Sequence, residues 1–298
     1  MKIPITFLGT GQAIPTKKRN HTAILLTYKS ENILIDCGEG TQRQFRKLNI
    51  NPCKLTKILI THWHGDHILG LPGLLQTLAL NNYNRKLEIY VPKGTKHYMD
   101  LIFRLFVFQG KIKYQVIECE QGKIFENNDF LIEAAKMEHN IPCLAFSFIE
   151  KEKIRINKEK LSKLGIKGKL IGELAKGKDI EFQGKKIKAS ELTYLQEGKK
   201  ISFILDTAIN PNCEKIAKNS DLLICESTYT EKEADRAREY KHLTAKQAAE
   251  IAKKSKSKKL ILTHLSQRYE NKEKLILQEA KKIFKNTEVA SDLMKTEI

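Results

Sequence analysis

Three histidines and one aspartate lie within six consecutive positions, directly after a short apolar run. The run, residues 57–60, predicts a buried strand, and it leads into His62, His64, Asp66 and His67. Imidazole nitrogens and carboxylate oxygens are ligands that zinc takes in proteins. A single histidine on an apolar face is usually part of the core, but this group straight after a strand indicates a metal site.

The spacing of these four residues divides them into two pairs. His62 and His64 are two positions apart, so their side chains point the same way if the backbone is extended. Gly65 permits a sharp turn, which would direct Asp66 and His67 to a different place. Two pairs predict two metal ions, and two neighbouring ions can hold both the attacking and the leaving oxygen of a phosphoryl displacement.

Other polar residues follow other predicted strands and complete the expected ligand set. One zinc ion is assigned, by spacing, to His62, His64 and His139. The second zinc ion is assigned to Asp66, His67 and His264. Asp206 is assigned to both ions, because a carboxylate offers two oxygens and an imidazole offers only one free nitrogen.

The chemistry expected at such a site is hydrolysis. Zinc lowers the pKa of a bound water towards neutrality, and the resulting hydroxide could attack phosphorus or a carbonyl carbon. Asp66 is expected to accept the proton of that water while it remains a ligand. His242 precedes a helix with a Thr244–Gln247 capping box and is free to donate a proton to the leaving oxygen. Glu226, at a neighbouring strand end, would either orient His242 or be a carboxylate that supports the ligands or lies at the surface.

The charge of the chain favours a polyanionic partner. Its 298 residues include 53 Lys and Arg against 35 Asp and Glu, a net charge of +18. Nucleic acid is the expected partner, although a lysine-rich proteome would give the same bias. Residues 151–200 hold 15 of these cations against 7 of the anions. We expect a basic insertion at about 150–195, either an arm for a phosphate backbone or an ordinary polar insertion.

The cysteines and the start of the chain favour a cytoplasmic protein with no membrane association. The six cysteines are scattered and form no Cys-x-x-Cys pair, as expected of reduced thiols. Residues 1–9 lack the long apolar core of a signal peptide. No run approaches the roughly 20 apolar residues of a membrane span.

Strand and helix patterns recur along the chain and predict an α/β fold in two halves. Expected strands include residues 3–8, 23–28, 32–35, 88–91, 113–118, 130–135, 200–205, 221–225 and 259–262. Expected helices include residues 41–48, 69–80, 95–108, 245–254 and 273–284. The aromatic residues Phe103, Phe106 and Phe108 are expected to pack in the core. Polar residues at the strand ends of both halves fit a four-layer (α+β) sandwich.

Eight motifs, in order along nearly the whole chain, resemble those of the metallo-β-lactamase superfamily and, within it, the ribonuclease Z family. They are residues 7–11, 15–20, 36–42, 61–67, 205–207, 225–228, 242–244 and 263–269. The resemblance implies an αβ/βα metallo-β-lactamase sandwich, a single domain of residues 1–298 with the insertion at about 150–195 as a protruding exosite arm. It also implies a homodimer with two Zn²⁺ per subunit. The implied reaction cleaves precursor tRNA after the discriminator nucleotide, leaving a tRNA 3′-hydroxyl and a 5′-phosphorylated trailer.

The resemblance extends to residues that would contact the substrate. Lys17, Arg19 and Asn20 lie in a loop similar to the family's Pro-x-Lys-x-Arg-Asn loop, which is associated with reading the tRNA 3′ end. On physical grounds alone, the cations of this loop are equally well explained as solvated side chains. Ser266 and Arg268 would help to hold phosphate near the metals.

The chain departs from the family pattern in three places. The arm often carries a Gly-Pro motif in the family, and here Lys167 and Lys169 stand in that stretch, where they would bind tRNA by charge. Trp63 occupies a position that usually holds a smaller apolar residue, and core packing is the expected reason. Leu243 replaces a serine beside His242, a change that we expect to be tolerated.

Two other functions are compatible with the same ligands. A small-molecule hydrolase of this fold, acting on a thioester, lactone or cyclic phosphodiester, would need neither the basic arm nor the loop at 15–20. Affinity for RNA that falls as salt rises separates this alternative from a nuclease. A noncatalytic RNA-binding protein on the same fold would be expected to have lost ligands, and absence of zinc affinity would identify it.

Overall fold

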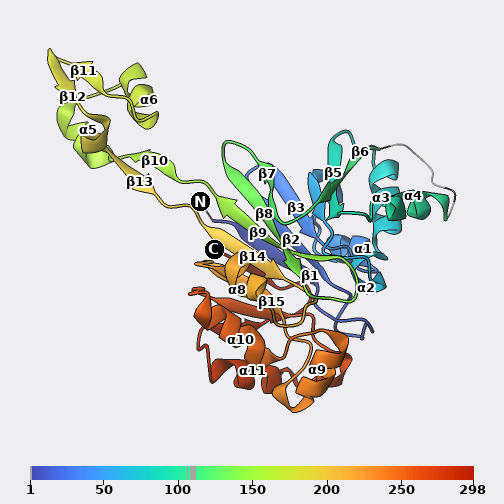
Figure 1. The fold of residues 1–298 in the computed structure, drawn as a ribbon. Helices are drawn as coiled ribbons and strands as arrows, with labels where there is room; N and C mark the ends of the chain where they lie inside the picture. Colours follow the sequence, from blue (N-terminus) through green and yellow to red (C-terminus); the bar gives the residue numbers. More distant parts are fainter. Residues whose placement is uncertain (1, 106, 108–111) are drawn as a thin grey trace. The chain divides into compact units, whose positions relative to one another are not determined.

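The computed structural model describes residues 2–105, 107 and 112–298, which form two compact units. The larger one, unit 1, comprises residues 1–125, 132–148 and 200–298. The smaller one, unit 2, comprises residues 126–131 and 149–199. Most elements of both units carry their labels in Figure 1.

The first sheet consists, among the described residues, of seven strands in the order β18-β1-β2-β3-β4-β5-β6. Their bounds are β1 Pro4–Gly9, β2 Ala23–Tyr28, β3 Glu31–Ile35, β4 Lys57–Leu59, β5 Lys86–Pro92, β6 Lys113–Cys119 and β18 Lys295–Glu297. The hairpin of β2 and β3 is antiparallel, as expected, whereas β3, β4, β5 and β6 run parallel. The ends of β3 and β4 therefore lie side by side at one edge of the sheet.

The second sheet runs in the order β17-β16-β15-β14-β9-β8-β7. Its strands are β7 Gly122–Glu126, β8 Phe130–Met137, β9 Cys143–Glu150, β14 Lys200–Ile204, β15 Leu222–Glu226, β16 Leu260–Thr263 and β17 Thr287–Val289. Strands β14 to β17 are parallel. Because parallel strands end at the same edge, the polar residues that follow β14, β15 and β16 meet there.

Helices cover one face of each sheet in unit 1 (Figure 1). The first sheet packs against α1 (Thr41–Lys47), α3 (Leu71–Leu80) and α4 (His97–Arg104), and the second against α8 (Pro211–Ala217), α10 (Ala245–Lys254) and α11 (Glu273–Lys281). In β2, Leu25 belongs to the core under the helices, while its neighbours Ile24 and Leu26 are buried on the opposite face. A strand buried on both faces needs a layer on each side, so the predicted four-layer αβ/βα sandwich is confirmed.

Most of the expected elements are present with small shifts at their ends. The helix expected over 95–108 is the shorter α4, where Phe103 packs against the core, and Phe106 and Phe108 lie outside the described residues. The capping box of Thr244 is present, because its side chain accepts from Gln247 N and the Gln247 side chain accepts from Thr244 N. Within the described chain, no helix combines the length and the apolar character needed to cross a membrane.

Unit 2 has a small core of its own. Its elements are β10 Lys153–Ile156, α5 Lys158–Leu164, α6 Lys169–Ala175, β11 Ile180–Phe182, β12 Lys185–Ile187, α7 Ala189–Leu192 and β13 Thr193–Gln196. Leu161, Leu174, Ile180 and Leu192 are buried together, and β10 pairs antiparallel with β13. The basic stretch thus forms helices and hairpins that its weak apolar periodicity did not predict.

Candidate metal centre

The first ligands follow the end of β4. His62 is buried, and His64 has an extended backbone with φ −71° and ψ 150°, directly before the short helix α2 (Gly65–Ile68). The chain changes direction because this helix begins, and Gly65 does not adopt a left-handed conformation. The predicted turn is therefore present, but the conformational freedom of glycine is not its cause.

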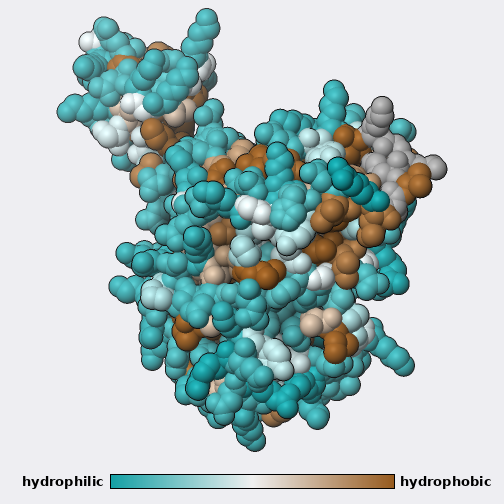
Figure 2. Space-filling model, turned by 45° about the vertical axis from the view of Figure 1, so that its right-hand side comes forward, coloured by the Kyte–Doolittle hydropathy of each residue, from teal (hydrophilic) through white to brown (hydrophobic). Residues whose placement is uncertain are grey.

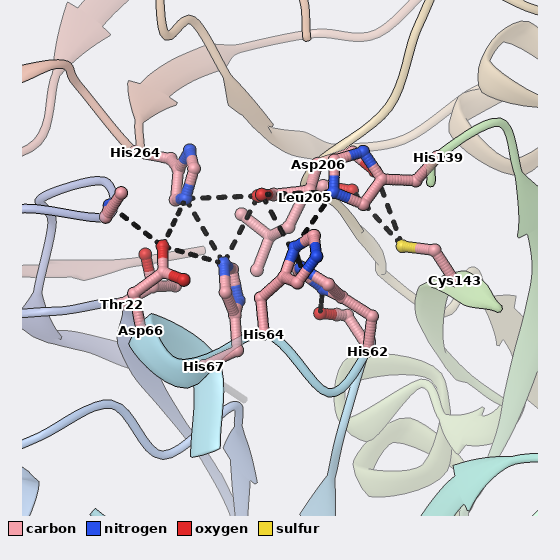
Figure 3. Close-up of polar contacts among 12 residues, drawn as sticks. Thr22, His62, His64, Asp66, His67, His139, Cys143, Leu205, Asp206 and His264 are labelled. Carbon is pink, nitrogen blue, oxygen red and sulfur yellow. Dashed lines mark hydrogen bonds and ion pairs between the residues drawn. The ribbon is translucent and has the colours of Figure 1, made fainter. Parts of the chain in front are cut away.

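One group of donor atoms gathers around His64. The Nδ1 atom of His64 lies 3.1 Å from Nε2 of His62 and 3.1 Å from Nε2 of His139. Oδ2 of Asp206 lies 3.6 Å from Nε2 of His62 and 3.9 Å from Nε2 of His139. Figure 3 shows these side chains pointing toward one another.

A second group gathers around His67 and His264. Their Nε2 atoms lie 3.2 Å apart, and Oδ2 of Asp66 is 3.4 Å from each of them. Oδ1 of Asp206 lies 3.3 Å from His67 Nε2 and 3.1 Å from His264 Nε2. Asp206 thus turns one oxygen toward each group (Figure 3), and the structure brings together all seven residues in the two sets that the spacing predicts.

Three residues of this centre, two of them members of the donor groups, have left-handed backbone conformations although none is glycine. Asp36, Asp206 and His264 follow β3, β14 and β16 with φ of 55°, 32° and 57°. Such conformations cost on the order of 1–3 kcal/mol each and persist where the surrounding structure enforces them. Positive φ also occurs at other non-glycine positions of the described chain, but these three residues are buried and lie at the strand ends that carry the donor atoms.

Behind the ligands, the buried carboxylate of Asp36 fixes two of the histidines. Its Oδ2 accepts a hydrogen bond from Nδ1 of His67 at 2.6 Å and from the Thr61 hydroxyl at 2.8 Å. Because the Thr61 hydroxyl donates to Asp36, its oxygen accepts from Nδ1 of His62, 3.0 Å away. Both rings therefore turn Nε2 toward the donor groups, one ring in each group.

A second buried carboxylate, Glu226 at the end of β15, organises the opposite side. It accepts from the backbone N–H of Thr207 at 2.7 Å and from the Thr228 hydroxyl at 2.6 Å. Nδ1 of His242 lies 3.1 Å from Oε2 of Glu226. The Thr228 oxygen also accepts from Nδ1 of His264 at 3.1 Å, so the same network orients a ligand and the free histidine.

The charges of the centre call for a cation. Burial lowers the pKa of His62, His64 and His139 and favours their neutral rings. Burial opposes the ionised form of Asp206, but His264 and His67 hold its pKa well below the usual range. Burial likewise opposes a proton on His67, yet the surrounding carboxylates, Asp206 first, raise its pKa. The carboxylates around His67 therefore favour a positive charge at this place, which a bound metal ion can supply instead of a proton.

The residues present fit a divalent metal in each group. In the group around His64, the facing imidazole nitrogens lie 3.1 Å apart, and neutral rings can turn a lone pair, rather than a proton, toward each other. A cation between these nitrogens would accept both lone pairs. Oδ1 of Asp206 is buried and has no hydrogen-bond partner among the described residues. Nitrogen and carboxylate oxygen donors in sets of four form the ligand chemistry that zinc takes.

His242 stands beside the two groups rather than within them. Its Nδ1 lies 3.9 Å from Oδ2 of Asp206, and it forms a possible third donor set with Glu226 and His264. Burial disfavours a charge on this ring, but Glu226 and then Asp206 outweigh burial and raise the pKa of His242 to about 9. At neutral pH the ring carries a proton that it could donate.

The loop at 15–20 has both interior and exposed cations. Arg19 is buried, and its Nη1 donates to Thr10 Oγ1 at 2.7 Å and to the Ala290 carbonyl at 2.8 Å. Lys17 is exposed, and the Asn20 amide donates to the backbone of the neighbouring motif at 36–42. Arg19 thus anchors the loop from within, and the substrate contacts of the three residues remain predictions.

The other predicted substrate residues differ in their surroundings. Ser266 is buried at the start of a short 3-10 helix, and Nη1 of Arg268 forms an ion pair with Glu233 at 2.6 Å. Lys167 and Lys169 are exposed in unit 2. Arg268 is therefore held by a protein carboxylate, while the two lysines face solvent.

Sequence reasoning gave no role to Asp36, Thr61 or Thr228, although all three fix ligands. Asp36 directly follows the apolar run of β3, the same arrangement that singled out Asp206 after β14. The indication for Asp36 was its place directly after β3, since β3 runs parallel to β4 and the residues that follow the two strands lie close together. The two threonines carry no such pattern, because their roles depend on partners brought together by the fold.

Comparisons with known proteins extend over the whole chain. It is 40% identical to "Ribonuclease Z" of Methanothermobacter thermautotrophicus over 99% of this chain and 96% of the relative, and 40% identical to "Ribonuclease Z" of Protochlamydia amoebophila over 97% and 95%. Residues 3–156 match the family model described as "Anti-Pycsar protein Apyc1". The solved short form of human tRNase Z is 29% identical, with a TM-score of 0.72 and coverage of 98% of both chains.

Proposed function

The chain belongs to the ribonuclease Z family, and we propose that it removes the 3′ trailer from tRNA precursors by hydrolysing the phosphodiester after the discriminator nucleotide. The products are a tRNA 3′-hydroxyl and a 5′-phosphorylated trailer. The proposal rests on the similarity to "Ribonuclease Z" over nearly the full chain, together with the presence of all seven predicted donor residues in two groups that share Asp206.

We propose that the two donor groups each hold a zinc ion. His62, His64 and His139 would bind one ion, and Asp66, His67 and His264 the other. Asp206 would bind both through its two oxygens. Bound zinc supplies Lewis acidity at the phosphoryl oxygens and a water of lowered pKa.

The chain's own groups would move the protons. His242 would donate its proton to the leaving 3′ oxygen, and Glu226 would keep the ring turned toward the reaction. Asp66 would accept the proton of the attacking water. Its Oδ2 also accepts from the backbone N–H of Ala13 at 2.9 Å, a bond that supports the ionised carboxylate. Burial opposes this charge, but His67 and His264 lower the pKa of Asp66.

Several further features of the substrate complex are proposals that rest on family membership. The loop with Lys17, Arg19 and Asn20 would receive the tRNA 3′ end beside Asp66, while Ser266 and Arg268 would hold phosphate. The insertion at about 150–195 would be an arm of a single metallo-β-lactamase-fold domain, and its exposed Lys167 and Lys169 would contact the tRNA backbone. We further propose a cytoplasmic homodimer. The six free cysteines suit a reducing compartment.

Cleavage of a 3′-extended tRNA transcript, with the ends of the products mapped, tests the proposed function. A single cut after the discriminator nucleotide is expected, and a chelator should abolish it because both donor groups would be emptied. Restoring activity with Zn²⁺ or with Mn²⁺ identifies the metal that supports turnover. Brisk hydrolysis of a small ester or phosphodiester without any cut in tRNA would instead indicate a small-molecule hydrolase.

Replacing residues 157–192 by Asn-Gly tests the arm. Ile156 and Thr193 are paired in the hairpin of β10 and β13, so a two-residue turn can close the shortened strands. The change removes most of the basic side chains of unit 2, and tRNA affinity should fall about tenfold or more with a shallower salt dependence. Hydrolysis of bis(p-nitrophenyl) phosphate should be unaffected. Equal loss of both activities would contradict a separate role in tRNA binding.

A further inference from the structure

A cavity of about 490 Å³ lies beside the metal centre, on the side of His64. One wall is the ligand loop itself, with Trp63 and His64. A second wall is Ile141 and Pro142, in the loop that carries the third ligand histidine of that group. Helix α4 supplies the third wall, including Tyr98. Two of the three walls are thus built by the ligand loops, so an occupant would be continuous with the substrate at the metals.

The walls of this cavity are apolar and aromatic. The ring centroids of Trp63 and Tyr98 lie 5.1 Å apart with an angle of 42° between the planes. Leu101 on α4 is 55% exposed, and Figure 2 shows apolar side chains gathered near this end of the helix. Among the described lining residues there is no lysine, arginine, aspartate or glutamate. The cavity therefore suits a flat uncharged group rather than a phosphate.

We propose that the cavity binds the base of the first trailer nucleotide. The inference rests on the proposed function, in which the phosphodiester held at the metals has a nucleoside on either side. The loop at 10–13 lies against the other donor group, because Ala13 N–H donates to Asp66 and Gly11 pairs with Leu265. The tRNA 3′ end is assigned to that side. The cavity at His64 is then the place for the trailer.

Stacking on Trp63 and Tyr98 makes this site tolerant of base identity. Every base has a face that can stack on an aromatic ring, whereas reading a base edge needs free hydrogen-bonding groups. The Thr95 hydroxyl in the wall is already donated to the Pro92 carbonyl, and Nε1 of Trp63, which has no partner among the described residues, is buried. A larger base should bind better than a smaller one, and an abasic position should bind worst.

Precursor tRNAs with adenine, uracil or an abasic site at the first trailer position test the proposal. For the wild type, the abasic substrate should lower kcat/KM roughly tenfold, as expected for loss of one base–aromatic stack. Trp63→Leu and Leu101→Ser should reduce this difference to within about twofold, because the base then gains little from the cavity. Leu80→Ser, a matched surface change at a 65% exposed leucine on α3, should keep the wild-type ratio.

The alternative outcomes are distinguishable. If tRNA is cleaved equally well with and without the first trailer base, the cavity proposal is wrong while the proposed function stands. If no precursor is cleaved, the proposed function itself fails. If removal of the discriminator base, rather than of the first trailer base, lowers kcat/KM in a way that depends on Trp63 and Leu101, the assignment to the trailer is wrong.

A Leu101→Ser variant that changes oligomeric state but keeps the full abasic penalty would show that a second copy of the chain covers this face. The metal content of Trp63→Leu shows whether this substitution disturbs the ligand loop. If it does, the abasic penalty of Leu101→Ser, which lies on α4 outside that loop, tests the proposal.

Discussion

Asp206→Asn should remove both metal binding and tRNA cleavage. The carboxylate of Asp206 turns Oδ1 toward His67 and His264 and Oδ2 toward His62, so one substitution weakens both donor groups. The asparagine amide has nearly the same shape, but it carries no charge, and its N–H₂ group would replace the carboxylate oxygen that faces one of the two donor groups. We expect the cleavage rate to fall by at least about a thousandfold, with metal content measured on the purified chain falling in parallel.

Asp221→Asn is the matched control for this prediction. Asp221 lies at the opposite end of the same sheet, where it accepts from the backbone N–H of Lys200 at 2.8 Å and pairs with Lys258 at 2.8 Å. The same chemical change there should leave metal content and cleavage close to wild type. If Asp206→Asn bound two metal ions and cleaved tRNA normally, the bridging role of Asp206 would be wrong.

His242→Ala should slow cleavage by about 10²–10⁴-fold, the usual contribution of a general acid. The ring lies outside the two main donor groups, and Glu226 holds Nδ1 so that Nε2 is free for the leaving oxygen. Metal content and tRNA affinity should therefore stay close to those of the wild type. Single-turnover rates, measured together with binding of a precursor under metal-free conditions, separate the chemical step from affinity.

Glu226→Gln provides a graded comparison for His242. The glutamine keeps the size of the side chain but weakens the interaction that orients the ring and favours its protonated form. Its rate should fall less than that of His242→Ala, and combining the two changes should add little to the loss from His242→Ala alone. Loss of metal from His242→Ala would show that this histidine is a ligand and that its assignment as an acid is wrong.

Much of the fold follows from local patterns in the chain. The apolar run at 57–60 and the capping box of Thr244 depend on neighbours a few positions away, and both predictions are confirmed. The α/β sandwich follows from strands and helices that alternate, since each needs a partner for its apolar face. Unit 2 was harder to predict, because its core is assembled from a few widely spaced apolar residues such as Leu161 and Ile180.

The candidate site divides in the same way. His62, Asp206 and His264 could be predicted because each is a metal-ligating residue type that follows an apolar strand. Parallel strands bring their ends to one edge of the sheet whatever the details of packing. The loop prediction named Arg19 as a substrate contact, and this stays a prediction; what the fold adds is that its guanidinium donates to the Thr10 hydroxyl and to a backbone carbonyl. Which side of a loop residue is buried depends on distant segments, and no local pattern records it.

The sequence by itself determined which residues could bind metal and which strand ends would carry them, because residue chemistry and hydrophobic periodicity are local properties. Only the tertiary structure decided that Asp36 supports one histidine in each donor group, at Nδ1 of His67 directly and at His62 through Thr61. It also decided that Trp63 lines a cavity together with α4. These relations join residues far apart in the chain, and their geometry is set by strand register and side-chain packing, which no short stretch of sequence specifies.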